Sequence, residues 1–177
     1  MENQILIKHK WFWAWNDDKE EAWLSRMART GFHLQSIGLP GKYTFLTGEP
    51  REDIYRLDYI IKGQDHEHYL QLFRDAGWEY LGEMGGWQYF RTRKENNQVP
   101  EIYTDNASKT KKYTRLLTHL TIFLPIYVVL ATRPVSTDGN FSNLYSIVRL
   151  IMSLILVLYA YAMARLFMRI NQLRKKI

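Results

Sequence analysis

The sequence predicts an α+β domain followed by a two-helix transmembrane hairpin. Two observations lead to this class. Residues 1–105 contain the element pattern strand, helix, strand, strand twice in succession. Two long apolar segments, 116–132 and 144–164, then close the chain, and basic residues crowd their outer flanks.

The first copy of the pattern begins with alternating residues. The side chains at positions 7–15 alternate in the manner of a strand, which would place Trp11, Trp13 and Trp15 on one face. A helix is predicted over 17–30, because Asn16 or Asp17 can cap it and Gly31 can end it. Two further strands are predicted over 32–37 and 43–46, around the turn Leu39-Pro40-Gly41-Lys42.

The second copy follows at an offset of 46 positions. It comprises a strand over 54–61, a helix over 65–76, and strands over 78–83 and 87–92 around the turn Gly85-Gly86. At this offset Trp23 matches Tyr69, and Gly31 matches Gly77. Such a repeat predicts two similar units. We expect them to share an antiparallel sheet with both helices on one face, as a two-layer sandwich.

The C-terminal part divides into a linker helix over 106–115, a span over 116–132, an external loop over 133–143, a second span over 144–164 and a tail over 165–177. Pro125 is expected to kink the first span without ending it. The basic residues expected at the membrane surface are Lys109, Lys111, Lys112, Arg115, Arg165, Arg169, Arg174, Lys175 and Lys176.

These basic residues predict the topology of the chain. The loop between the spans holds only Arg133 and Asp138, so the positive-inside bias places both termini in the cytoplasm and the loop outside. We therefore expect a multi-pass protein of the cell membrane, with residues 1–105 as a cytoplasmic domain. Arg149, near the outer end of the second span, is either a ligand or partner contact or an arginine that reaches the outer headgroups; its position favours the headgroups.

Charge is unevenly divided along the chain. The net charge is +6, but residues 1–105 carry 13 Lys plus Arg against 17 Asp plus Glu, whereas residues 106–177 carry 11 against 1. The basic C-terminal part therefore suits the lipid bilayer as a partner. The acidic charge of the N-terminal domain argues against nucleic acid as a partner. The chain has no cysteine, which excludes disulfides and thiolate chemistry.

No set of residues predicts catalysis, a cofactor or a metal site. In Asp65-His66-Glu67-His68 the histidines are two positions apart, and such residues face different ways on a helix. His33 is expected to face solvent from its strand. The glycine turns lie between strands, not before a helix N-terminus where a phosphate would bind. We therefore expect a protein that is not an enzyme.

Aromatic density is the feature that suggests a binding site. A groove at the junction of the two units can hold an apolar or cationic small molecule, with a carboxylate as counter-charge. The alternative is that the same rings fill the core. The residues proposed for the groove are Trp11, Trp13, Trp15, Tyr59, Trp78, Tyr80, Glu79 and Glu83.

Several short segments are distinctive as a set, among them Gly31-Phe32-His33-Leu34, Tyr55-Arg56-Leu57-Asp58-Tyr59, Asp75-Ala76-Gly77-Trp78-Glu79-Tyr80 and Gly86-Trp87-Gln88-Tyr89-Phe90. With them the chain resembles an uncharacterised bacterial domain-of-unknown-function family of small membrane proteins. The resemblance covers residues 5–115. It implies an aromatic-rich domain ahead of membrane helices, often encoded beside PadR-type regulators, and a stress-response or signalling role.

The leading hypothesis is thus a membrane-tethered cytoplasmic sensor or interaction module that binds a protein partner, of unknown identity, or a small amphipathic molecule. The alternative is a structural subunit of a larger membrane complex.

Overall fold

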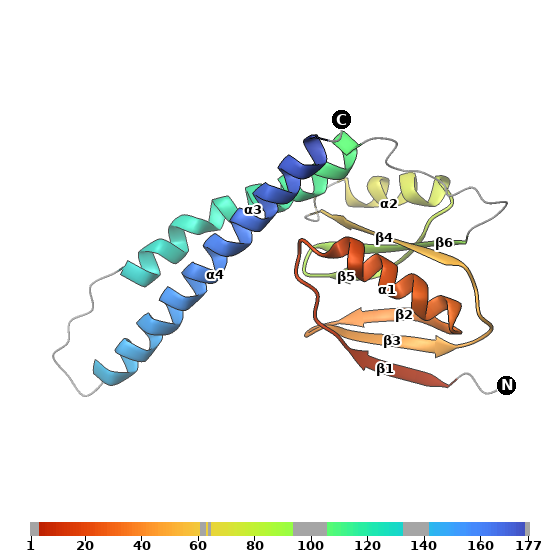
Figure 1. The fold of residues 1–177 in the computed structure, drawn as a ribbon, viewed down its shortest axis with the longest axis horizontal. Coiled ribbons are helices and arrows are strands. Elements are labelled where there is room, and N and C mark those ends of the chain that lie inside the picture. The colour runs from red at the N-terminus through yellow and green to blue at the C-terminus, as the bar shows by residue number, and fades with distance from the viewer. Residues whose placement is uncertain (1–3, 61–62, 64, 94–105, 133–141, 176–177) are drawn as a thin grey trace. The chain divides into compact units, whose positions relative to one another are not determined.

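The computed structural model describes residues 4–60, 63, 65–93, 106–132 and 142–175 (Figure 1). The chain forms two compact units, residues 1–104 and residues 105–177. The first unit is the α+β domain, and the second contains two long helices. The predicted α+β class and the twice-repeated order of elements are confirmed.

The first copy of the repeat forms a three-stranded antiparallel sheet with one helix. Its elements are β1 (Ile5–His9), α1 (Asp17–Arg29), β2 (Phe32–Gly38) and β3 (Lys42–Thr47), and the strand order is β1-β3-β2. Helix α1 ends before Gly31, whose φ of 82° is one that residues with a Cβ rarely adopt. A Cβ at this position would also lie 2.5 Å from the carbonyl oxygen of Gly48.

The second copy repeats this arrangement. Its elements are β4 (Asp53–Tyr59), α2 (His66–Asp75), β5 (Glu79–Met84) and β6 (Trp87–Arg93), with strand order β4-β6-β5. Gly77 ends its helix with a φ of 81°. The β2–β3 register shifts between Leu34 and Ser36, and the β5–β6 register shifts between Tyr80 and Gly82, again 46 positions on. The repeat therefore extends to a shared irregularity in the sheet.

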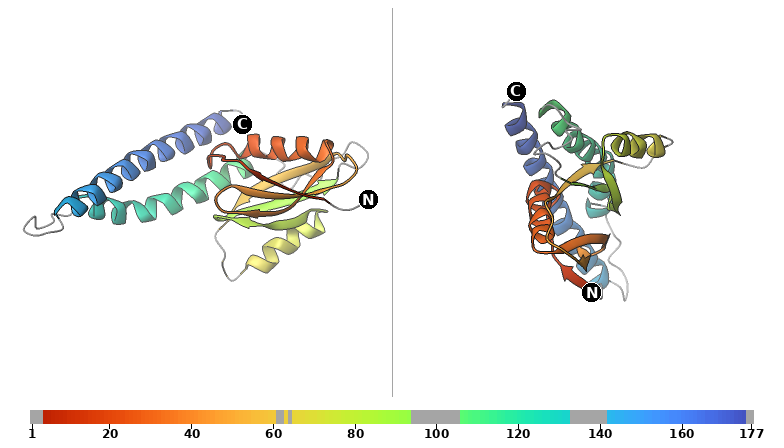
Figure 2. Two further views of the ribbon diagram at one scale, coloured as in Figure 1. Left: turned by 90° about the horizontal axis from the view of Figure 1, so that it is seen from below. Right: turned by 90° about the vertical axis from the view of Figure 1, so that its right-hand side faces the viewer.

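The strands form two sheets and not the single shared sheet that we expected. Strand β2 lies beside β5, yet β2 pairs only with β3 and β5 only with β6 in the described ladders. Helix α1 packs on β4 of the second copy as well as on β2 of its own. Figure 2 shows α1 and α2 on opposite sides of the strands, so the two helices do not share a face.

Side-chain alternation on the second sheet explains how it accepts a helix on each face. On β6, Tyr89 joins the core beneath α1, while its neighbour Phe90 joins a second core beneath α2. The first sheet has no second cover within the described domain. Leu6 packs against the core, but Ile5 and Ile7 on the other face of β1 are 64% and 49% exposed. The repeat symmetry is broken at this face.

The first strand is shorter than the sequence predicts. We expected it to run over 7–15, but β1 ends at His9, opposite Lys42, the first residue of β3. Lys10 makes one further backbone hydrogen bond, from its N–H to the carbonyl of Gly41. Beyond Lys10, partner strand β3 offers no more residues, so the chain leaves the sheet and Trp11, Trp13 and Trp15 lie in the connection to α1.

The second unit contains α3 (Asn106–Thr132) and α4 (Ser142–Arg174), which pack against each other. The predicted linker helix and first span form one continuous helix that passes through Pro125. The second predicted span likewise continues into residues that we assigned to a tail. Both helices are long and apolar enough to cross a membrane. Most of the predicted loop between them, residues 133–141, lies outside the described residues.

Candidate functional site

Three tryptophans form a ladder in the connection between β1 and α1. The rings of Trp13 and Trp15 are stacked, with centroids 5.2 Å apart and planes 4° apart, and Trp11 meets Trp13 edge-on at 6.1 Å. A hydrogen bond from the N–H of Asn16 to the carbonyl of Trp13 closes the turn below them. Trp15 is 7% exposed, Trp13 42% and Trp11 62%. The ladder therefore begins in the core and ends in solvent.

The ladder is fixed to the hairpin between β2 and β3. Gly41 approaches the connection so closely that a Cβ on it would lie 2.3 Å from the carbonyl oxygen of Lys10. The ammonium of Lys10 lies over the rings of Phe12 and Trp23, 5.0 and 4.8 Å from their centroids. Leu39 at the tip of this hairpin is 73% exposed. The start of the ladder therefore lies against a hairpin that also exposes an apolar side chain.

The other aromatic residues proposed for the groove lie elsewhere. Tyr59 is buried and packs edge-on against Trp87, with ring centroids 5.6 Å apart. Trp78 is buried beneath α2, and the half-buried Tyr80 packs on Phe90 in the same core. These rings occupy the core positions that the alternative interpretation assigned to them. Ligand binding at them stays a prediction.

The two proposed counter-charges are engaged by neighbours on β6. The Glu79 carboxylate accepts hydrogen bonds from both Nε and Nη2 of Arg91, at 3.0 and 2.6 Å. The Glu83 carboxylate accepts a hydrogen bond from the Gln88 amide at 3.0 Å. The charges that flank the ladder in the sequence and in the hairpin are basic, namely Lys8, Lys10 and Lys42.

A buried carboxylate at the junction of the two copies was not foreseen. Glu20 of α1 is 5% exposed, and its Oε1 accepts hydrogen bonds from the hydroxyl groups of Tyr43 on β3, at 2.7 Å, and Tyr89 on β6, at 2.6 Å. Burial raises the pKa of Glu20, although the two phenol donors oppose this shift. Burial and the nearby carboxylate raise the pKa of both tyrosines, so both remain donors.

The next residue of α1 also joins the two copies. Glu21 accepts a hydrogen bond from the backbone N–H of Leu57 at 2.9 Å and forms an ion pair with Arg56 at 3.0 Å. Its carboxylate thus satisfies a backbone donor of β4, which pairs with β6 alone among the described strands. Glu20 and Glu21 hold the first helix onto the second sheet. In the sequence they look only like the acidic first turn of a helix.

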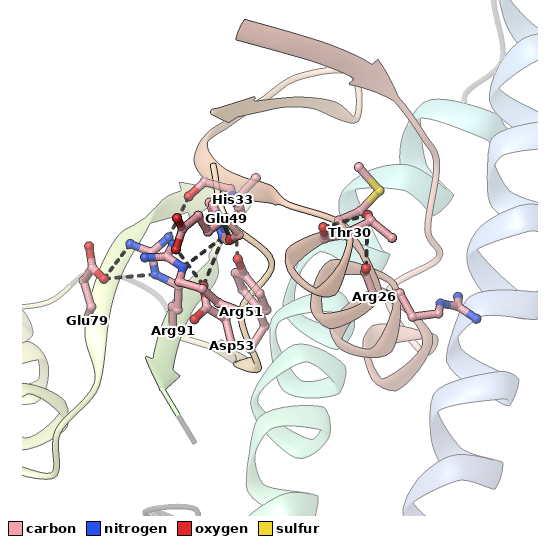
Figure 3. Close-up of polar contacts among 11 residues, drawn as sticks. Arg26, Thr30, His33, Glu49, Arg51, Asp53, Glu79 and Arg91 are labelled. Carbon is pink, nitrogen blue, oxygen red and sulfur yellow. Dashed lines mark hydrogen bonds and ion pairs between the residues drawn. The ribbon is translucent and has the colours of Figure 1, made fainter. Parts of the chain in front are cut away.

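A second polar cluster surrounds Asp53 at the start of β4 (Figure 3). The Asp53 side chain is fully buried, and its Oδ2 lies 3.4 Å from Nδ1 of His33 and 3.3 Å from Nη2 of Arg51. His33 in turn contacts the carbonyl oxygen of Glu49 through Nε2, at 2.8 Å. We expected His33 to face solvent, but it is 8% exposed. That expectation was wrong because the segment between β3 and β4 folds over β2.

The basic residues of the second unit are unevenly exposed. Lys111, Arg165, Arg174 and Lys175 are exposed, whereas Lys112 is buried, with its ammonium 5.4 Å from the centre of the Tyr113 ring. Arg169 of α4 lies 6.0 Å from the same ring. Arg149 is exposed near the start of α4. The side chains of Lys109 and Lys176 lie outside the described residues.

The model of a family described as "Protein of unknown function (DUF2812)" matches residues 16–124, which is more than half of the chain. No curated protein and no solved structure matches the chain significantly.

Proposed function

The chain belongs to the DUF2812 family, and we propose that it is a non-enzymatic sensor or interaction module, tethered to the inner face of the cell membrane by α3 and α4. The observation that carries the proposal is the exposed end of the tryptophan ladder on a domain whose chain continues into two helices long enough to cross a membrane. Trp11 and Trp13 are large apolar rings that the described domain leaves in solvent. Rings of this kind mark binding surfaces.

The charge around the ladder selects among amphipathic molecules. We had expected Glu79 and Glu83 to favour hydrophobic cations, but these carboxylates are bonded to Arg91 and Gln88. Lys8 and Lys42 are both exposed and lie at the ends of β1 and β3 from which the chain enters and leaves this region, where Lys8 pairs with Tyr43 and Lys42 with His9. An apolar tail with an anionic headgroup therefore fits this surface better than a cation does.

Fluorescence titration of the full chain, held in nanodiscs of zwitterionic lipid, tests the proposal. A short alkyl phosphate should change the tryptophan emission saturably, and an alkylammonium of equal length should do so less. The matched control is Trp11→Phe/Trp13→Phe, in which partition of the amphiphile into the lipid is the same. An equal response from this variant and the natural chain would refute binding at the ladder.

The alternative function is that of a structural subunit of a larger membrane complex. The observation in its favour is that α3 and α4 expose many large apolar side chains, among them Ile122, Val129, Leu150 and Leu154. Either lipid or further helices can cover these side chains. Purification in mild detergent separates the two functions, because a subunit should co-purify with fixed partners in constant ratio and a sensor should be obtained alone.

The resemblance to membrane proteins encoded beside PadR-type regulators supports a signalling role for the module. The orientation we propose has both termini in the cytoplasm, with the flanking basic residues near anionic headgroups.

A further inference from the structure

Two segments that are distant in the sequence, the connection after β1 and the β2–β3 hairpin, lie side by side on the domain. The backbone N–H of Lys10 donates to the carbonyl of Gly41 at 2.9 Å, which sets the start of the tryptophan ladder against the β2–β3 hairpin. The large apolar side chains that these two segments expose are Trp11, Trp13 and Leu39, by 62%, 42% and 73%. We call these three residues, with Lys8, Lys10 and Lys42, the docking edge.

The docking edge is basic within an acidic domain. Residues 5–15 and 36–46, which supply it, contain three lysines and no Asp or Glu. The domain as a whole carries more acidic than basic residues. Apolar rings beside lysines suit the boundary between acyl chains and headgroups, where tryptophan is enriched and where anionic lipids of the cytoplasmic leaflet attract basic residues.

A short connection joins the domain to α3. Twelve residues separate Arg93, the end of β6, from Asn106, the start of α3. Even fully extended, twelve residues span only about 40 Å. If α3 and α4 cross the membrane, the domain therefore meets that membrane at a high effective concentration, whereas a soluble partner must diffuse to it.

We propose that the docking edge binds the cytoplasmic surface of the membrane that holds α3 and α4, with Trp11, Trp13 and Leu39 inserted among the headgroups and the lysines paired with anionic lipid. The inference rests on the tethering in the proposed function and identifies the amphipathic ligand of the ladder as lipid. The domain then exists in docked and released states, and the charge of the membrane sets the balance between them.

The distribution of tryptophan makes this proposal testable in the full chain. All six tryptophans lie in residues 11–87, and none lies in α3 or α4. Quenching of tryptophan emission by brominated acyl chains therefore reports contact between the domain and the bilayer and is blind to the spanning helices. The experiment compares vesicles of mixed phosphatidylserine and phosphatidylcholine, with and without bromine on the acyl chains.

The natural chain should lose emission in the brominated vesicles, and Trp11→Phe/Trp13→Phe should abolish that loss. Trp87→Phe is the matched control, because Trp87 is half-buried and packs against Tyr59, and it should retain the loss. Lys8→Glu/Lys42→Glu changes only exposed side chains and should reduce the loss in anionic vesicles. Added salt should reduce it in the natural chain as well.

Four results would overturn the docking. Equal quenching of the natural chain and Trp11→Phe/Trp13→Phe would place the contact elsewhere on the domain. If the chain is not quenched but resists extraction from the vesicles by alkaline carbonate, the membrane tether stands and the docking is refuted. If carbonate extracts the chain, both the membrane tether and the docking are refuted. If the double variant instead turns a dimer into a monomer without any change in quenching, the edge binds a second copy of the chain.

Discussion

The hydroxyl of Tyr89 donates a hydrogen bond of 2.6 Å to the carboxylate of Glu20, 69 residues earlier in the chain. This bond joins the last strand of the second copy to the helix of the first. Tyr43 donates to the same oxygen at 2.7 Å. One buried carboxylate and two phenols therefore join the two copies within a largely apolar core, in addition to the contacts of Glu21 with β4.

Glu20 should make the stability of the domain depend on pH. Because burial raises its pKa above the ordinary value of 4.5 in the folded state, the folded domain binds the proton more tightly than the unfolded chain. Its contribution to stability is complete below pH 4.5 and is lost as pH rises through the folded-state pKa. Glu20→Gln should flatten this part of the profile of stability against pH. The measurement is the urea midpoint of each chain in detergent, followed by tryptophan emission, and the difference between the variant and the natural chain at each pH. Parallel profiles for the two chains would contradict the raised pKa.

Tyr89→Phe should cost about 1.5–3 kcal/mol of stability at neutral pH, because it removes a hydrogen bond to a charged acceptor. Tyr80→Phe is the matched control, since the Tyr80 hydroxyl bonds the neutral amide of Gln88 at 2.9 Å. We expect about 1 kcal/mol for that loss. The free energy of unfolding of both variants gives the comparison. An equal cost in the two would mean that the Glu20 carboxylate adds nothing beyond a neutral acceptor.

Trp23 and Tyr69 should be equivalent core residues. The Trp23 ring meets Phe45 edge-on at 5.7 Å, and the Tyr69 ring meets Phe90 edge-on at 6.1 Å. Phe45 and Phe90 each lie on the central strand of their sheet. Replacing either with Ala should cost about 3–5 kcal/mol, with Tyr69 toward the lower end because it is half-buried. Urea denaturation measures both costs. Near-neutral effects at both positions would contradict the repeat alignment.

Arg51→Met should destabilise the domain more than Asp53→Asn does. The first change leaves the fully buried Asp53 carboxylate without its guanidinium, a loss expected toward the lower end of about 3–5 kcal/mol because Arg51 is itself partly exposed. The second change removes the buried charge, and Arg51 can then turn toward water. The order of the two unfolding free energies is the measurement, and the reverse order would show that the ion pair does not stabilise Asp53.

Reporters fused before Met1 and after Ile177 should both be cytoplasmic, and a tag beside Gly139 should be reached from outside intact cells. Nine basic residues flank the two predicted spans on the side expected to be cytoplasmic, against Arg133 alone in the loop. Protease accessibility of the three tags checks the arrangement. A C-terminal tag cleaved in intact cells would contradict it.

The sequence by itself determined the features that depend on near neighbours in the chain. Alternation, helical periodicity and the glycines at positions 31 and 77 predicted the order of elements, the repeat and the two long helices. These signals are local, because a backbone conformation is favoured by residues only a few positions apart.

Only the tertiary structure decided which faces were covered and by which element. Alternation shows that Tyr89 and Phe90 point to opposite faces of β6, but the placement of α1 against the second sheet depends on Glu20 and Glu21, which meet β6 and β4 across tens of residues. The end of β1 at His9 likewise follows from the length of its partner β3, and it leaves Trp11 and Trp13 in solvent. The burial of His33 depends on a segment that returns over β2 with Arg51 and Asp53. Such contacts arise from pairing between distant segments, and no local periodicity records them.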